Sequence, residues 1–238
     1  MKKQLPNIIT LLNLFSGTVA ITLAFQNDFK GVVIWVIIAA IFDFFDGFTA
    51  RLLKSFSEIG KDLDSLADVV SFGVAPACAL FVLMKGYITE YEYAYTIYNY
   101  LPYIAFLIPA FSAYRLAMFN HDERQTINFI GLPTPANGMF WVSACYVLKF
   151  KPIDGQYIIY ILTGMVLVMS ILMVSNLNML SFKIKNLSFR DNFWRILLAV
   201  VSVIFIIVWG IGGIAVSVAS YIIISLIALP QVKRDTVK

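Results

Sequence analysis

Four aspartates lie at helical spacings near the point where one apolar run ends and the next begins: Asp43, Asp46, Asp64 and Asp68. The first two are three residues apart and the last two are four apart, so each pair lies on one face of a helix. A charged group inside a membrane helix costs about 3 kcal/mol or more unless it is paired, metal-bound or in a wet cavity. Four converging carboxylates would also repel one another. Because clusters of carboxylate oxygens suit Mg²⁺, Mn²⁺ or Ca²⁺, we predict that the four aspartates bind divalent metal.

Small residues and an arginine are interleaved with these aspartates. Gly47, Ala50 and Gly60 leave room for the close approach of a backbone or a flat nucleotide. Arg51 can present a planar fork of donors to phosphate oxygens. Metal and arginine together would bind a diphosphate. In the alternative interpretation, the aspartates face the cytosol near helix ends and pair with Arg51, Lys54 and Lys61.

The composition predicts that membrane helices position these residues. Of 238 residues, 60% are hydrophobic and 13% are charged, and the mean hydropathy is +0.82, whereas a soluble domain carries about 25% charged residues. Cys78 and Cys145 lie inside apolar stretches and do not indicate a disulfide framework. The net charge of +4 is small and located in loops, so it does not indicate a nucleic-acid partner.

Apolar runs predict an all-α, polytopic bundle of about eight transmembrane helices. We treat residues 1–238 as one membrane domain, with a six-helix core over about 1–180 and two additional helices over about 190–230. No cleavage site follows the first run, which we interpret as a retained span. The expected spans are Ile8–Phe25, Val32–Leu53, Leu66–Met84, Leu101–Phe119, Pro133–Leu148, Tyr157–Val174, Phe193–Trp209 and Ile211–Leu229.

The distribution of Lys and Arg predicts the orientation. If both termini are cytoplasmic, only Lys30, Lys85, Lys149 and Lys151 of the 18 basic residues lie outside. Basic residues concentrate in cytoplasmic loops, so this arrangement is favoured. The aspartates then lie near the cytoplasmic ends of the second and third spans, and the site faces the cytoplasm.

The spacing of these residues resembles the signature of the CDP-alcohol phosphatidyltransferase family at every fixed position, as Asp43-x2-Asp46-Gly47-x2-Ala50-Arg51-x8-Gly60-x3-Asp64-x3-Asp68. The resemblance implies that the four aspartates hold two metal ions, Mg²⁺ or Mn²⁺, with Asp68 also acting as general base. It further implies that the signature's other residues, together with Asp46 and Asp64, line the pocket for CDP, with Arg51 on the diphosphate.

Four further segments resemble the membrane-embedded members of this family that use serine: 6–14, 71–77, 114–120 and 131–137. The resemblance implies transfer of the phosphatidyl group from CDP-diacylglycerol to L-serine, giving phosphatidylserine and CMP. It also implies a homodimer in a bacterial cytoplasmic membrane, in contact with membrane lipid.

Candidate contacts to the acceptor lie outside the signature. Arg115 could pair with the serine carboxylate or a lipid phosphate, or extend to headgroups. Thr134 lies within a Pro-rich helix start, and Asn137 follows it; this helix start could bind a carboxylate or could be a plain turn. The resemblance places Asn13 near the nucleotide, and a hydrogen bond between helices explains it equally well.

Two rival functions remain open. The same reaction could use glycerol 3-phosphate or inositol phosphate, because Arg115, Arg124 and Lys61 could bind the additional phosphate. A divalent-cation transporter could use the same aspartates, although it would need acidic groups through the depth of the membrane.

Overall fold

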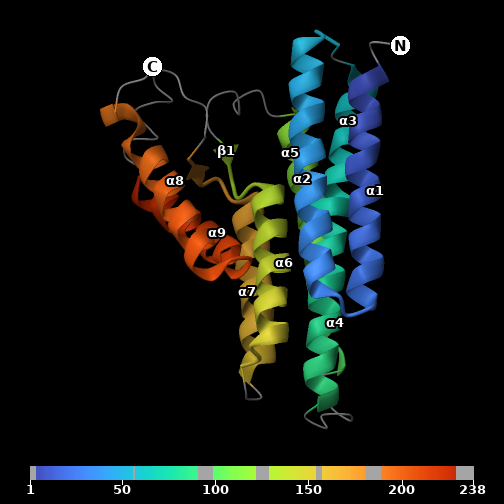
Figure 1. Cartoon of the computed structure of the whole chain (residues 1–238), viewed down its shortest axis with the longest axis vertical. Helices are drawn as coiled ribbons and strands as arrows, with labels where there is room; N and C mark the ends of the chain where they lie inside the picture. Colours follow the sequence, from blue (N-terminus) through green and yellow to red (C-terminus); the bar gives the residue numbers. More distant parts are fainter. Residues whose placement is uncertain are drawn as a thin grey trace.

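The computed structural model describes residues 4–55, 57–90, 99–121, 129–153, 157–180 and 189–228. Nearly all of these residues are helical (Figure 1). The elements are α1 Leu5–Phe25, α2 Phe29–Leu52, α3 Glu58–Asp68, a π-helical segment Val69–Val74, α4 Ala75–Glu90, a 3-10 helix Leu101–Phe106, α5 Leu107–His121, β1 Phe129–Ile130, α6 Thr134–Phe150, α7 Tyr157–Val174, β2 Asn178–Met179, α8 Phe189–Trp209 and α9 Gly212–Ile227.

Among the described residues, six helical stretches are long and apolar enough to cross a membrane. They are Leu5–Phe25, Phe29–Leu52, Glu58–Ile88, Leu101–His121, Tyr157–Val174 and Asn192–Trp209. The remaining two expected spans correspond to α6, with 17 residues, and α9, with 16, both shorter than the usual 20 or so. The protein is therefore an integral membrane helical bundle. The count of eight spans stays a prediction.

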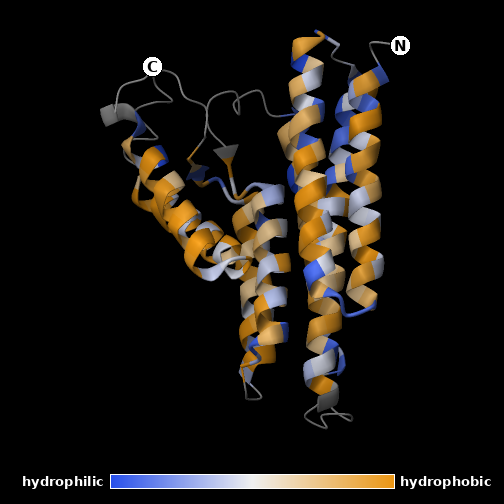
Figure 2. Cartoon of the chain, in the orientation of Figure 1, coloured by the Kyte–Doolittle hydropathy of each residue, from blue (hydrophilic) through white to orange (hydrophobic). Residues whose placement is uncertain are grey.

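The orientation also stays a prediction, because many of the basic residues behind it lie outside the described residues. These are Lys2, Lys3, Arg124, Lys183, Lys185, Lys233, Arg234 and Lys238. Figure 2 shows hydrophobic residues over most of the helical surface, with hydrophilic residues gathered where α3 begins.

A short antiparallel pair, β1 with β2, was absent from the all-α prediction. It pairs Phe129 with Met179 and Ile130 with Asn178. The Gly131 N–H then donates to the Leu177 carbonyl at 2.8 Å. The pair ties the chain entering α6 to the end of α7, so it fixes where α6 begins.

The third membrane-spanning stretch, Glu58–Ile88, changes from α-helical to π-helical hydrogen bonding directly after Asp68, where the segment Val69–Val74 begins. Such wide turns are rare and often lie at functional sites. Gly17 of α1 and Gly138 of α6 hold this segment between them: a Cβ on Gly17 would lie 2.7 Å from Ser71 Cα, and one on Gly138 would lie 2.7 Å from the Phe72 carbonyl oxygen. Close helix contact at small residues is typical of membrane bundles.

We therefore expect Gly17→Ala and Gly138→Ala to destabilise the fold by about 1–3 kcal/mol each, the usual cost of overpacking. Gly164→Ala on α7 is the matched control, because nothing lies within 4 Å of its added Cβ. The midpoint of thermal unfolding in detergent measures the effect. Equal midpoints for all three variants would contradict this packing.

Candidate active site

The chain between α2 and α3 brings the two pairs of aspartates to the same end of the bundle. Helix α2 ends at Leu52, and Lys54 adopts a left-handed conformation with φ 49. Ser57 then caps α3 by accepting a hydrogen bond from the Gly60 N–H at 3.0 Å. Helix α1 packs against both α2 and α3. Because α1 contacts both helices, its packing helps to set the distance between α2 and α3.

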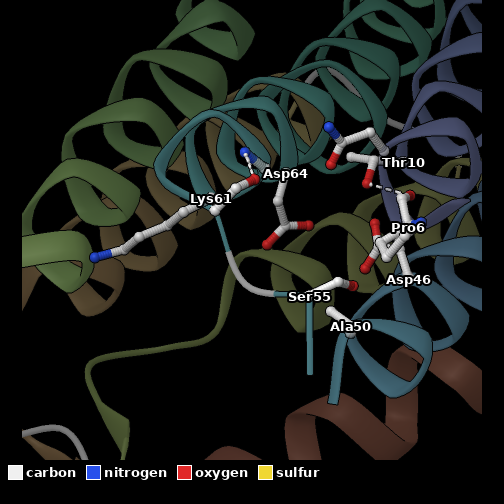
Figure 3. A pocket seen from close by; sticks show the side chains of 11 residues that line it. Pro6, Thr10, Asp46, Ala50, Ser55, Lys61 and Asp64 are labelled. Atoms are coloured by element: carbon white, nitrogen blue, oxygen red, sulfur yellow. Dashed lines mark hydrogen bonds between the residues drawn. The ribbon is translucent and has the colours of Figure 1, made fainter. Parts of the chain in front are cut away.

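Three of the four aspartates form one cluster. Carboxylate oxygens of Asp43, Asp64 and Asp68 all lie within 4.8 Å of one another. Asp46 is outside this group and lies beside Thr10 and Pro6 of α1 (Figure 3). The prediction that all four aspartates converge thus holds for three of them, and Asp46 lies beside the group.

This donor set fits a divalent cation. The three clustered side chains offer only oxygen ligands, which hard cations prefer. Asp64 Oδ1 and Asp46 Oδ2 are buried and have no hydrogen-bond partner within the described part of the chain. Buried carboxylate oxygens without a partner are costly, and a metal ion offsets that cost.

A cavity of about 200 Å³, the glycine-lined cavity, lies on the α1 side of the cluster. It is lined by Pro6, Asn7, Thr10, Asp46, Gly47, Ala50, Ser55, Ser57, Gly60, Lys61 and Asp64. Figure 3 shows Asp64 projecting from α3, with Asp46, Ala50 and Ser55 together across from it at the end of α2.

The two glycines of this cavity have different roles. A Cβ on Gly47 would enter open space, with Arg51 Nη2 the nearest atom at 4.0 Å. A Cβ on Gly60 would meet Ser57 Oγ at 2.9 Å and Asn7 Oδ1 at 3.0 Å. Gly47 therefore leaves room for a ligand, whereas Gly60 lets the first turn of α3 approach α1. Arg51 is exposed, donates from Nε to the Gly47 carbonyl at 3.0 Å, and is not one of the lining residues.

A second cavity of about 300 Å³, the arginine-lined cavity, lies on the other side of the cluster. It is lined by Asp43, Lys61, Asp64, Ser65, Asp68, Arg115, Leu116, Phe119, Asn120, Pro133 and Pro135. Lys61 and Asp64 line both cavities. The Lys61 side chain extends away from the glycine-lined cavity (Figure 3), and its Nζ donates to the Asn120 carbonyl at 2.5 Å. Of the three clustered aspartates, Asp64 thus lies where the two cavities adjoin.

Arg115 is the buried cation of the second cavity, with only 6% of its surface exposed. Its Nη1 donates to Thr134 Oγ1 at 3.3 Å, and its guanidinium lies 5.8 Å from the Phe119 ring centre. Its Nε has no hydrogen-bond partner within the described residues. Thr134 therefore orients the Arg115 guanidinium through Nη1, and the Nε–H group remains available to a ligand.

Asn137 and Asn13 are not among the residues that line either cavity. Asn137 is buried one turn into α6 and donates from Nδ2 to Met173 Sδ at 3.3 Å. Asn13 is buried on α1 and donates from Nδ2 to Asp68 Oδ1 at 3.3 Å, and its carbonyl accepts from Ser71 Oγ at 3.0 Å. Asn13 thus makes the hydrogen bond between helices that the sequence allowed, and its partner is one of the clustered aspartates.

Several lining residues were not assigned a role from the sequence. Asn7 and Thr10 precede Asn13 at intervals of three, which gives α1 a polar stripe on one face. That spacing was a usable signal. Ser55 and Asn120 carried none, because their place in the linings depends on the turn after α2 and on the packing of α5 against α3.

Comparison with known proteins agrees with this geometry. The family model described as CDP-alcohol phosphatidyltransferase matches residues 3–230. A Helicobacter pylori protein is 34% identical, over 75% of this chain and 72% of its own length. A Bacillus subtilis protein is 33% identical, over 57% and 71%, and a Methanocaldococcus jannaschii protein is 33% identical, over 68% and 70%. All three relatives are named CDP-diacylglycerol–serine O-phosphatidyltransferase.

Proposed function

Because the chain belongs to the CDP-alcohol phosphatidyltransferase family of enzymes, we propose that it transfers the phosphatidyl group of CDP-diacylglycerol to L-serine. The products are phosphatidylserine and CMP. One observation carries the proposal: the cluster of Asp43, Asp64 and Asp68 lines a cavity that contains a buried arginine, and its member Asp64 also lines a cavity with space for a flat group. The names of the relatives support serine as the acceptor.

The cytidine diphosphate occupies the glycine-lined cavity in this proposal. Gly47 supplies the open space, and Asp46, Ala50, Gly60 and Asp64 supply the remaining lining that the signature implies. Arg51, exposed beside Gly47, binds the diphosphate at the rim.

Gly47→Val is expected to raise the KM for CDP-diacylglycerol by at least about tenfold, because the added side chain enters the ligand's space without meeting the protein. The KM for serine and the thermal midpoint should stay near those of the unmodified protein. Initial rates over a series of CDP-lipid concentrations measure this. An unchanged KM would exclude Gly47 from the nucleotide site.

In the reaction, the serine oxygen forms a bond to the phosphorus that carries diacylglycerol, and the bond from that phosphorus to CMP oxygen breaks. Asp68 accepts the hydroxyl proton, and Asn13 holds the Asp68 carboxylate through its 3.3 Å hydrogen bond. Asp43, Asp64 and Asp68, with Asp46 beside them, would hold a divalent cation, which would supply charge neutralisation for the diphosphate. An ordinary carboxylate is a weak base for an alcohol, so positioning of both substrates contributes much of the acceleration.

Arg115 binds the serine carboxylate, with Thr134 holding the guanidinium. We expect Arg115→Gln to raise the KM for serine by at least about 30-fold, since loss of a buried charge partner costs about 2 kcal/mol or more. The KM for CDP-diacylglycerol should change little.

Ethanolamine, which lacks the carboxylate, is the matched control substrate for this variant. The unmodified enzyme should strongly prefer serine to ethanolamine, and Arg115→Gln should lose that preference. If the variant kept it, the carboxylate would bind elsewhere. Identification of the lipid product by mass spectrometry, from a mixture of serine, glycerol 3-phosphate and inositol phosphate, tests the acceptor itself.

We place the enzyme in a bacterial cytoplasmic membrane as a homodimer, with Mg²⁺ or Mn²⁺ at the aspartates and the site facing the cytoplasm. The excess of basic residues in the expected cytoplasmic loops supports the orientation. Chemical crosslinking in native membranes tests the dimer, and labelling of cysteines introduced into the loops tests the orientation.

A further inference from the structure

A third and larger cavity, of about 460 Å³, lies beside the arginine-lined cavity. We call it the apolar cavity; it is lined by Ile37, Pro133, Pro135, Ala136, Met139, Leu198, Ser202, Ile206, Ile214, Ser217, Val218 and Tyr221. Pro133 and Pro135 line both this cavity and the arginine-lined cavity. The apolar cavity therefore adjoins, at these two prolines, the cavity that Asp43 and Asp68 line.

The chemistry of the lining points to hydrocarbon. Most lining residues are aliphatic or proline. The Ser217 hydroxyl donates to the Gly213 carbonyl at 2.7 Å, and the Tyr221 hydroxyl donates to the Leu180 carbonyl at 3.1 Å. Since two of the three lining hydroxyls are committed to the main chain and Ser202 carries the third, the cavity offers an apolar ligand a favourable surface and a polar ligand little compensation.

The cavity runs from the aspartates toward the middle of the membrane. Ile37 precedes Asp43 by six residues on α2, which places it about 9 Å further along the helix axis. On the other side, α8 and α9 form an inclined hairpin against α6 (Figure 1). Ser143 of α6 anchors the turn of this hairpin, donating to the Ile211 carbonyl at 2.6 Å and accepting from the Ala215 N–H at 3.1 Å.

We infer that one hydrocarbon chain of the lipid donor lies in the apolar cavity, which makes the α8–α9 hairpin part of the lipid-binding site. This inference rests on the proposed function, because the donor's phosphates must lie at the aspartates for its chain to enter past Pro133 and Pro135. The hairpin then selects the donor by the length of its chain.

The direct test uses CDP-diacylglycerol with a diazirine in one acyl chain, irradiated with the full-length protein in nanodiscs. We expect labelled peptides from residues 198–206 and 214–221, with labelling suppressed by unlabelled CDP-diacylglycerol and not by phosphatidylglycerol. Labelling confined to the exposed face of α2 would overturn the inference. Equal suppression by both lipids would also overturn it, because the cavity would then hold bulk lipid.

A pair of variants supplies the second test. Ala136→Phe places a ring in the apolar cavity, whereas Val203→Phe places one on α8 where the residue is 55% exposed. Ala136→Phe should raise the KM for a long-chain CDP-lipid at least about tenfold, the loss expected when about two methylenes leave apolar contact. The KM of Ala136→Phe for a short-chain CDP-lipid should equal that of the unmodified protein. Val203→Phe should leave the KM for both lipids unchanged.

The two tests separate this inference from the proposed function. If the proposed function is wrong, the unmodified protein turns over neither CDP-lipid. If only the inference is wrong, the unmodified protein turns over both, and Ala136→Phe affects both chain lengths equally or neither. Should Ala136→Phe fail to fold, the crosslinking result on the unmodified protein decides.

Discussion

Replacing Asp68 with asparagine is expected to abolish turnover while largely sparing the binding of CDP-diacylglycerol. An amide cannot accept the hydroxyl proton, and loss of a general base typically costs about 10²- to 10⁴-fold in rate. Asp68 lines the arginine-lined cavity and not the glycine-lined cavity assigned to the nucleotide. The side chain is 7% exposed and about isosteric with asparagine, so the fold should persist.

CMP release measures turnover in this variant, and equilibrium titration with the CDP-lipid measures binding. Asp62→Asn is the matched control, since Asp62 lies on the same helix, is exposed and lines neither cavity. Asp62→Asn should behave as the unmodified enzyme. Retained activity in Asp68→Asn would remove Asp68 from the role of base.

The second large effect is expected from removal of divalent metal. EDTA should reduce CMP release to background, and Mg²⁺ or Mn²⁺ should restore it, because the diphosphate and the clustered carboxylates would otherwise remain unneutralised. Asp64→Asn should lower activity by at least about 100-fold. Even mutation of a residue that only hydrogen-bonds to a metal ligand typically lowers metal affinity or activity about 10- to 100-fold. Asp64 is the clustered aspartate that lines both cavities.

Binding of Mn²⁺, followed by electron paramagnetic resonance without substrate, gives a readout independent of turnover. We expect weaker binding in Asp43→Asn and Asp64→Asn, and unchanged binding in Asp62→Asn. If EDTA-treated enzyme kept its rate, the aspartates would serve a purpose other than metal binding.

The sequence predicted much of this site because helical period constrains which residues share a face. The interval Asp64–Asp68 correctly placed both carboxylates in one cluster, whereas of the pair Asp43 and Asp46 only Asp43 joins it. Period does not give the rotation of one helix relative to another. The separation of Asp46 from the other three aspartates follows from how α1 packs against α2, which the spacing did not contain.

The boundaries of the helices were likewise predicted only in part. Hydropathy predicted a third span from Leu66, because the apolar run begins there, whereas the helix itself begins at Glu58 under the cap of Ser57. The π-helical segment Val69–Val74 and the β1–β2 pair were not predicted. Both depend on contacts between distant parts of the chain. Gly17 and Gly138 pack against the π-helical segment, and β1 pairs with β2, which follows α7.

The most direct test of the account is CMP release by the purified protein supplied with CDP-diacylglycerol and Mg²⁺ or Mn²⁺. The acceptor is L-serine, glycerol 3-phosphate or none, and each reaction is repeated with EDTA. The account predicts release that depends on serine and is abolished by EDTA. Release only with glycerol 3-phosphate would contradict serine as the acceptor and the role given to Arg115. No release with either acceptor, from protein shown to be folded, would contradict the proposed reaction and favour metal transport by the aspartates.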